Sequence, residues 1–282
     1  VDSRGNLRVA AAVGTADGEL ERVDLLAECH VDIIVIDTAH ADTKDVLKML
    51  KVVKQNFPDI DVVAGNVSEG DSAKRLAEAG ADGIKVGQGP GSTCTTRVVS
   101  GTGCPQVTAV YQCARAVRKW KIPVCADGGI TNSGDIVVAI AAGAHNVMLG
   151  RMLAGTDETP GDLENREGVL VKNYRGMGSL GALEASKASR ERYRQDSSMR
   201  KLVPEGVEGV VPYQGPVGNI LDQCVGGLRS GMGYVGARSI KQLQQKARFR
   251  RISSAGIAES HPHHILITRS APNYPFDTGL PR

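Results

Sequence analysis

Short apolar runs alternate with amphipathic stretches along the first 150 residues of the chain. The apolar runs are rich in β-branched residues and apolar almost throughout, which predicts parallel strands buried on both faces. These predicted strands cover residues 7–14, 32–38, 61–67, 83–87, 122–129 and 146–150. The stretches between them carry apolar residues at helical spacing, and several end in glycine, as helices commonly do. The predicted helices cover residues 19–30, 43–57, 69–80, 108–120 and 133–143.

Repeated strand and helix units are compatible with a doubly wound sheet or with a barrel. Polar and glycine-rich residues follow nearly every predicted strand, and functional loops gathered at the carboxyl ends of all strands are typical of a TIM (β/α)8 barrel. We therefore predict an α/β protein with a TIM barrel, of which six of the eight strands are present in this chain. Because the turn-like "VDSRGN" leads directly into a strand, we expect the chain to be part of a longer protein.

The repetition stops after residue 160. Residues 161–215 are polar and rich in charge, which predicts a loop and flap region or disorder. Beyond it, residues 218–236 predict a helix broken by glycines, residues 239–249 a helix that closes the barrel, and residues 251–274 irregular structure or part of an interface. We expect residues 1–282 to form a single catalytic domain.

Composition narrows the class of protein. The 282 residues, 41% of them apolar, are enough to bury one large core. The 34 basic and 31 acidic residues give a net charge of +3. Apart from "KARFRR" at 246–251, the basic residues are scattered along the sequence, whereas nucleic-acid and membrane binding usually need a concentrated basic surface. The six cysteines include no C-x-x-C pair, which favours reduced thiols in a cytoplasmic compartment over disulfides or a zinc site.

The stretch "GPGSTCTTR" at 89–97 carries the first candidate for chemistry. Its glycine-rich turn can direct backbone N–H groups at an anion, and a polar, partly exposed setting favours the thiolate of Cys94. Ser92 and Thr96 add hydroxyl groups on either side. From the residues alone, a nucleophile and a small buried thiol both remain open.

Two further glycine-rich stretches follow strands: "ADGGITNSGD" at 126–135 and "MLGRMLAG" at 148–155. Successive loops between strand and helix near the end of a barrel often form its phosphate site, although glycines also serve simple tight turns. Asp127, at a strand end, could accept hydrogen bonds from a pair of ribose hydroxyls. Asp37 also ends a strand, where capping a helix is as good an interpretation as binding a ligand.

Two other patterns are weaker. The imidazoles of His261, His263 and His264 have no cysteine or acidic cluster at ligand spacing, so a structural or exposed role is the better interpretation. The stretch "RERYRQ" at 190–195 has the composition of a solvated charged loop, unless that loop closes over a site.

Four long motifs together resemble the inosine-5′-monophosphate (IMP) dehydrogenase family: "GPGSTCTTRVVSGTGCPQVTAV", "ADGGITNSGD", "YRGMGSLGAL" and "GGLRSGMGYVGA". The resemblance extends from about residue 5 to Tyr274. It implies a TIM barrel with a long mobile flap after the last strand. It also implies oxidation of IMP to xanthosine 5′-monophosphate with NAD⁺, on the route to guanine nucleotides.

The resemblance further implies the site residues. Cys94 would attack C2 of the purine, hydride would pass to NAD⁺, and the covalent intermediate would be hydrolysed with the help of Thr96 and of the flap pair Arg192 and Tyr193. The implied IMP-binding residues are Ser92, Asp127, Gly129, Gly150, Arg151, Tyr174, Met177, Gly178 and Glu205. The implied NAD-binding residues are Asp37, Thr38, Asn66 and Gly87. A potassium ion would bind backbone carbonyls of Gly89, Gly91 and Cys94, completed by Glu259, Ser260 and His261 from a neighbouring subunit of a homotetramer.

The chain departs from the family pattern in two respects. Ala41 stands where the family usually has glycine, which is a departure at a position close to the implied dinucleotide contacts. The family's first two strands, one of which supplies a phosphate-binding serine, and its inserted pair of regulatory CBS modules would both precede Val1. An arginine base is also unusual, because its high pKa normally keeps it protonated.

Two alternatives remain. GMP reductase shares the barrel, the cysteine and the nucleotide site, but deaminates GMP reductively with NADPH. Its usual members carry a glutamate where this chain has Leu180 and lack the flap with its Arg-Tyr pair, although some reductases could retain such a flap. The second alternative is a catalytically silent nucleotide-binding scaffold, which would have no need for a nucleophile together with a set of residues that activates water.

Overall fold

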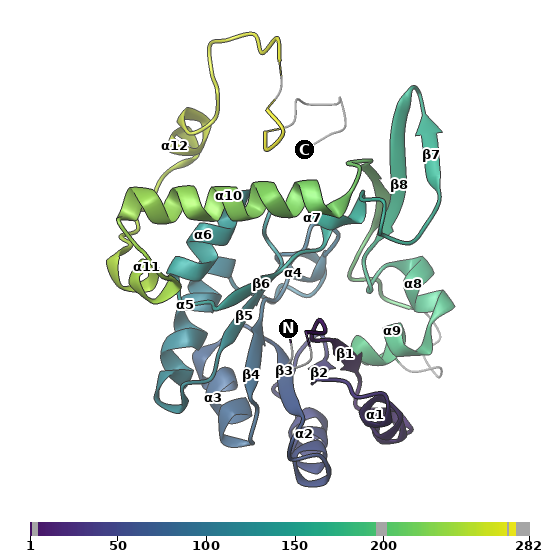
Figure 1. The fold of residues 1–282 in the computed structure, drawn as a ribbon. Helices are drawn as coiled ribbons and strands as arrows, with labels where there is room; N and C mark the ends of the chain where they lie inside the picture. The colour runs from purple at the N-terminus through teal and green to yellow at the C-terminus, as the bar shows by residue number, and fades with distance from the viewer. Residues whose placement is uncertain (2–4, 196–201, 270, 275–282) are drawn as a thin grey trace.

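A computed structural model describes residues 1, 5–195, 202–269 and 271–274 of the chain. Six parallel strands form one sheet in which spatial order follows sequence order. They are β1 (Ala10–Val13), β2 (Ile33–Asp37), β3 (Asp61–Val67), β4 (Gly83–Val86), β5 (Val124–Asp127) and β6 (Asn146–Met148). All six predicted strands are confirmed, and the sheet forms an open half-barrel rather than a doubly wound sheet (Figure 1).

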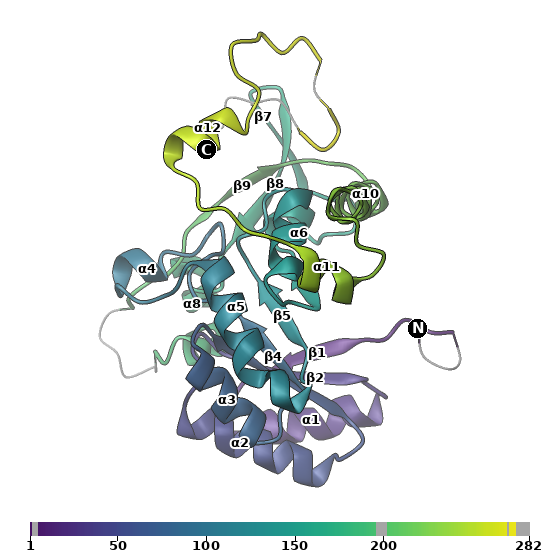
Figure 2. The ribbon, with the colours of Figure 1, turned by 90° about the vertical axis from the view of Figure 1, so that its left-hand side faces the viewer.

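The longer helices follow the strands and pack against the sheet (Figures 1 and 2). They are α1 (Glu19–Glu28), α2 (Lys44–Asn56), α3 (Gly70–Glu78), α5 (Gln106–Val117) and α6 (Ser133–Ala141). Shorter helical segments are α4 (Thr96–Val99), a 3-10 turn (Arg118–Trp120) and α7 (Arg151–Ala154). The sequence of α2 shows why they form. Its side chains at positions 46, 49, 50 and 53 lie on one buried face, and the Thr43 hydroxyl accepts a hydrogen bond from the Val46 N–H at the amino end.

Much of the stretch predicted as loop and flap is regular structure. The strands β7 (Leu163–Arg166), β8 (Val169–Arg175) and β9 (Glu208–Pro212) form a separate antiparallel sheet, and α8 (Leu180–Ala185) and α9 (Lys187–Arg192) lie between the last two. Glu167 and Gly168 join β7 to β8 with φ angles of 52° and 87°. Two consecutive positive φ values are typical of a tight hairpin turn, a signal that the high charge of this stretch obscured.

The predicted glycine-broken helix is wrong: α10 (Val217–Val235) is continuous over 19 residues. Its glycines do not interrupt the helix; they allow α10 to pack closely against α6. A Cβ on Gly227 would lie 2.2 Å from Ser133 Oγ, and a Cβ on Gly231 would lie 2.8 Å from Val137 Cγ1. The absence of these side chains lets the two helices approach closely (Figure 2).

Two shorter helices follow. The predicted helix at 239–249 appears as α11 (Ile240–Lys246), whose fully buried Leu243 packs beside α6, and it leaves the sheet open over the described residues. The tail is irregular except for α12 (Ser254–Glu259), which projects beyond α10 in both views (Figures 1 and 2). Within the described part of the chain, no helix is long and apolar enough to cross a membrane.

Candidate active site

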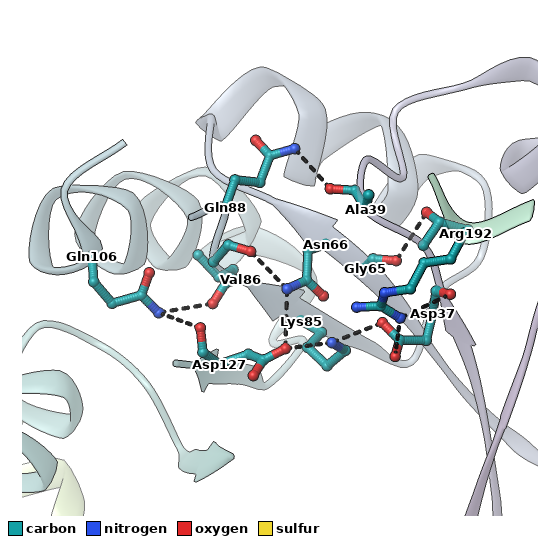
Figure 3. A network of polar contacts seen from close by, with 12 residues as sticks. Asp37, Ala39, Gly65, Asn66, Lys85, Val86, Gln88, Gln106, Asp127 and Arg192 are labelled. Atoms are coloured by element: carbon teal, nitrogen blue, oxygen red, sulfur yellow. Dashed lines mark hydrogen bonds and ion pairs between the residues drawn. The ribbon is translucent and has the colours of Figure 1, made fainter. Parts of the chain in front are cut away.

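The ends of β4 and β5 are held together at the carboxyl edge of the sheet (Figure 3). Gln106, at the start of α5, donates from Nε2 to the backbone oxygens of Val86 at 2.9 Å and Asp127 at 3.1 Å. Gly87 has a φ of 152°, and a Cβ there would lie 2.1 Å from the Asp127 carbonyl oxygen. Only glycine permits so close an approach of the two loops.

A buried lysine lies between two carboxylates at this edge. Lys85 on β4 is 1% exposed, and its Nζ is 2.9 Å from Asp37 Oδ1 and 2.5 Å from Asp127 Oδ2. Gly65 on the neighbouring strand leaves room for it, since a Cβ at Gly65 would lie 2.5 Å from Lys85 Cβ. An ammonium group is buried at low cost only when it is paired, and the two aspartates provide that pairing.

Arg192 reaches the same cluster from the end of α9 (Figure 3). Its Nη1 forms an ion pair with Asp37 Oδ2 and lies 3.3 Å from the Asp37 carbonyl oxygen. Its own carbonyl oxygen accepts a hydrogen bond from the Ala39 N–H at 3.3 Å. The structure therefore places the predicted flap residue Arg192 directly beside the predicted NAD-binding residue Asp37.

The charges in this cluster reinforce one another. Burial alone would raise the pKa of Asp37, but the positive charges of Lys85 and Arg192 outweigh it and lower that pKa. Burial likewise opposes the charge on Arg192, yet the attraction of Asp37 raises the pKa of Arg192 above its usual value. Pairing with Asp37 therefore favours the cationic form of Arg192.

Asn66, at the end of β3, presents a buried acceptor without a partner. The residue is 6% exposed, and its Nδ2 donates to the Gly87 carbonyl at 2.6 Å and to Asp127 Oδ2 at 3.0 Å. Its Oδ1 has no hydrogen-bond partner among the described residues. Since buried polar atoms are nearly always paired, this oxygen is suited to a donor on a ligand. Thr38, close by, donates from its hydroxyl to the Gly65 carbonyl at 3.2 Å.

Cys94 lies in the loop between β4 and α4, where it is partly exposed. Its Sγ lies 3.2 Å from Thr96 Oγ1, and its N–H donates to the Gly91 carbonyl at 3.0 Å. Two other thiols are made unreactive by burial, which raises the pKa of Cys113 to about 12 and of Cys125 to about 11. Cys94 is therefore better suited than either of these to react with a ligand.

The segment that leads into β9 is attached to the cysteine loop by backbone hydrogen bonds. The Thr95 N–H donates to the Glu205 carbonyl at 2.9 Å, and Cys94 and Gly206 form an isolated antiparallel bridge. The Glu205 N–H in turn donates to the Gly178 carbonyl at 2.9 Å. Two predicted IMP-binding residues, Glu205 and Gly178, thus lie next to the predicted nucleophile.

Two predicted phosphate or base contacts are glycines covered by tyrosine side chains. A Cβ on Gly178 would lie 2.6 Å from Tyr193 Cζ, and a Cβ on Gly150 would lie 2.7 Å from the Tyr174 hydroxyl. Tyr193, the second residue of the flap pair, therefore packs against the segment that carries Gly178. Burial raises the pKa of Tyr193, which keeps its hydroxyl protonated.

The other predicted IMP contacts lie on loops at the same edge. Arg151 begins α7 directly after Gly150, and a Cβ on Gly129 would come within 3.3 Å of Pro90 in the cysteine loop. Ser92 and Met177 are exposed. Gly129 is exposed as well and Arg151 is half-buried, so all four positions have surface that a ligand can reach.

The two halves of the predicted potassium site are apart within one chain. Gly89 and Gly91 belong to the cysteine loop, whereas Glu259 ends α12, which is remote from α4 in both views. Ser260 is exposed, and Nδ1 of His261 is 2.7 Å from the Tyr274 hydroxyl. The described residues contain no cluster of histidine, cysteine and acidic side chains that could hold a metal ion.

Sequence reasoning missed three residues of the site. Lys85 had a usable signal, because a lysine inside an apolar strand buried on both faces needs buried partners. Gln106 had none. Gln88 donates from Nε2 to the Ala39 carbonyl at 3.2 Å and accepts from the Ser68 hydroxyl at 2.5 Å, which joins the cysteine loop to the loops after β2 and β3.

An open sheet of parallel strands with polar loops at its carboxyl edge is part of a (β/α) barrel. The family model described as "IMP dehydrogenase / GMP reductase domain" matches residues 1–263. The chain belongs to the IMP dehydrogenase / GMP reductase family, as the sequence resemblance indicated.

Named relatives agree with this assignment. The chain is 58% identical to inosine-5′-monophosphate dehydrogenase from Aquifex aeolicus and 51% identical to that from Bacillus subtilis, each over 273 residues. The match covers 97% of this chain but only 55% of either relative, so the chain spans about half their length. A solved structure of a cysteine-to-alanine variant of GMP reductase from Trypanosoma brucei, in complex with guanosine 5′-monophosphate, has a TM-score of 0.87 and 47% identity. It matches 94% of this chain and 54% of its own.

Proposed function

We propose that this chain carries the catalytic part of a cytoplasmic enzyme that oxidises IMP to xanthosine 5′-monophosphate with NAD⁺. The observation that supports this best is the position of Arg192, which reaches across from α9 to pair with Asp37 at the carboxyl edge of the sheet. A segment with an Arg-Tyr pair at this place suits the hydrolytic half of a dehydrogenase, in which a water molecule must lose a proton.

The proposed reaction consists of two half-reactions, hydride transfer and hydrolysis. Cys94 attacks C2 of IMP, and the hydride that leaves C2 passes to the cofactor. Water then adds to C2 of the covalent adduct, its proton passes to a base, and the Cys94 sulfur leaves. Thr96, 3.2 Å from Cys94 Sγ, orients the water, and Arg192 and Tyr193 assist its deprotonation.

The ligand sites are proposed on the same edge. NAD⁺ would supply the hydride acceptor, held by residues at the ends of β2 to β4, where the unpaired Asn66 Oδ1 can accept from a ligand donor. IMP would place its ribose at Asp127 and its phosphate at the loops that carry Ser92, Gly129 and Gly150. Backbone carbonyls suit a potassium ion, which we propose binds between the cysteine loop and the α12 end of a neighbouring subunit in a homotetramer.

The test is a Cys94→Ala substitution in the protein made from its complete coding sequence, followed by NADH absorbance with IMP, NAD⁺ and a potassium salt. Cys29 is exposed and directly follows α1, so Cys29→Ala is the matched control. We expect Cys94→Ala to bind IMP without turnover, and Cys29→Ala to retain the parent rate. Turnover of IMP by Cys94→Ala would exclude the covalent mechanism.

GMP reductase is the second candidate, because a structure of that name is 47% identical to this chain. A parallel reaction with GMP and NADPH separates the two activities. Loss of NADPH absorbance with GMP, with no NADH formed from IMP, would reverse our assignment and show that Leu180 is compatible with reduction. Binding of IMP by the parent protein with neither reaction would identify a nucleotide-binding scaffold.

A further inference from the structure

We propose that Lys85 is a positioning residue for the hydrolytic half-reaction: it is a shared counter-ion for Asp37 and Asp127, and by balancing their charge it allows Arg192 to release its proton. The proposal rests on the function proposed above. It assigns a role to the most deeply buried charged side chain at the carboxyl edge, at 1% exposure. Figure 3 shows its ammonium group between the two carboxylates, with the guanidinium group of Arg192 beside the same Asp37 carboxylate.

The first step of the argument is the charge count in the cluster. Asp37 on β2 and Asp127 on β5 contribute two negative charges, and Lys85 on β4 and Arg192 on α9 contribute two positive charges. The neighbouring titratable groups, Tyr193 and Cys125, are both neutral, because burial raises the pKa of each. With Lys85 present, the cluster is neutral when Arg192 is protonated and carries one negative charge when it is not.

The second step follows from removing the lysine. Without its ammonium group, Arg192 would be the single cation facing two carboxylates, and its deprotonation would leave two uncompensated negative charges in a buried place. Like charges brought together in a poorly solvated site are costly, so Arg192 would hold its proton more firmly. Lys85 thereby favours the neutral guanidine that accepts the proton of the attacking water.

The third step is that stability alone does not account for the lysine. Burying an ion pair is often no better for stability than burying apolar side chains of the same volume. The neighbouring positions on β4, Ile84 and Val86, are fully buried apolar residues. An apolar residue at 85 would suit the strand, but it would leave the two carboxylates at the ligand site without their counter-ion.

The experiment compares Lys85→Gln with the parent by rapid mixing with IMP and NAD⁺. With IMP and NAD⁺ at concentrations that saturate the variant, we expect the initial burst of NADH, which reports hydride transfer, to be retained. The later steady rate, which reports hydrolysis, should fall about tenfold for each unit by which the pKa of Arg192 rises. The pH at which hydrolysis reaches its maximum should move upwards, because loss of a neighbouring positive charge favours the protonated guanidinium. Lys85→Arg, which keeps the charge, should return most of the hydrolytic rate.

Two controls separate this role from a merely structural one. Lys54 forms an ion pair of 2.7 Å with Asp82 at the opposite, amino end of the strands, so Lys54→Gln removes a lysine–aspartate pair, more exposed than that of Lys85, without touching the site. It should leave the ratio of burst to steady rate unchanged. In an Arg192→Gln background, Lys85→Gln should cause little further loss of hydrolysis, because the group that it acts on is gone.

The outcomes are distinct. An equal loss of burst and steady rate in Lys85→Gln, or an unshifted pH profile, would overturn the proposal for Lys85. If Lys85→Gln does not fold, Lys85→Arg carries the test: a parent-like pH profile supports the proposal, and a shifted profile contradicts it. A parent protein that forms no NADH from IMP would instead refute the function proposed above and leave the role of Lys85 without a reaction.

Discussion

At the scale of single residues, the missing Cβ atom of Gly87 lets two loops of the site approach closely. Its φ of 152° and the 2.1 Å between a Cβ placed there and the Asp127 carbonyl exclude any side chain. We predict that Gly87→Ala lowers the free energy of unfolding by more than about 2 kcal/mol, since it combines backbone strain with a clash. Gly134 on α6 has open space around it, so Gly134→Ala should be neutral or slightly stabilising. Denaturant titration of both variants tests this, and equal stabilities would contradict it.

Residues differ in how far the sequence alone predicts their roles. Cys94 and the glycines around it form a contiguous motif, so their loop and its position after a strand could be predicted. The Arg192 to Asp37 ion pair joins residues 155 positions apart, and composition predicted only a solvated loop around Arg192. Only the family resemblance indicated a role for the flap pair at the site. Lys85 escaped notice because the apolar character of its strand dominated the pattern.

At the scale of elements, spacing predicted the six strands, whereas composition misled in two places. Charge predicted loops where β7 and β8 form a hairpin, in which the consecutive residues Val171 and Lys172 of β8 are buried. Glycines predicted a break in α10, because a glycine lowers helix propensity. In both places a tertiary contact outweighed the local preference, and a single sequence carries no direct record of such a contact.

The contact between α10 and α6 gives an element-scale prediction. A leucine at Gly231 would meet Val137, whereas a leucine at Gly233 on the same helix would meet nothing within 4 Å at its Cβ. We expect Gly231→Leu to separate the helices and lower the free energy of unfolding by about 1–3 kcal/mol. Gly233→Leu should cost nothing, since leucine is the better helix former. Thermal melting of the two variants measures this, and a Gly231→Leu protein as stable as the parent would show that the packing adapts.

The whole molecule presents a sheet with two open edges. In the described residues β1 pairs only with β2 and β6 only with β5. Val9 is 53% exposed and Met148 42% exposed beside these edges. Unpaired strand edges expose backbone groups that favour pairing with further strands. A barrel of this class closes with eight strands, so we expect two further strands to occupy the gap.

Hydrogen exchange tests that expectation directly. In the protein made from its complete coding sequence, we predict that amides of β1 and β6 exchange as slowly as those of β3 and β4, because strands on both sides would then hold them. Residues 1–282 expressed alone should instead show fast exchange at β1 and β6 and slow exchange in the centre of the sheet. Fast exchange at both edges in the complete protein would mean that the barrel stays open. The proposed catalysis by Cys94 would then have to proceed on half a barrel. The Lys85 cluster would still be complete, because its residues come from β2, β4, β5 and α9.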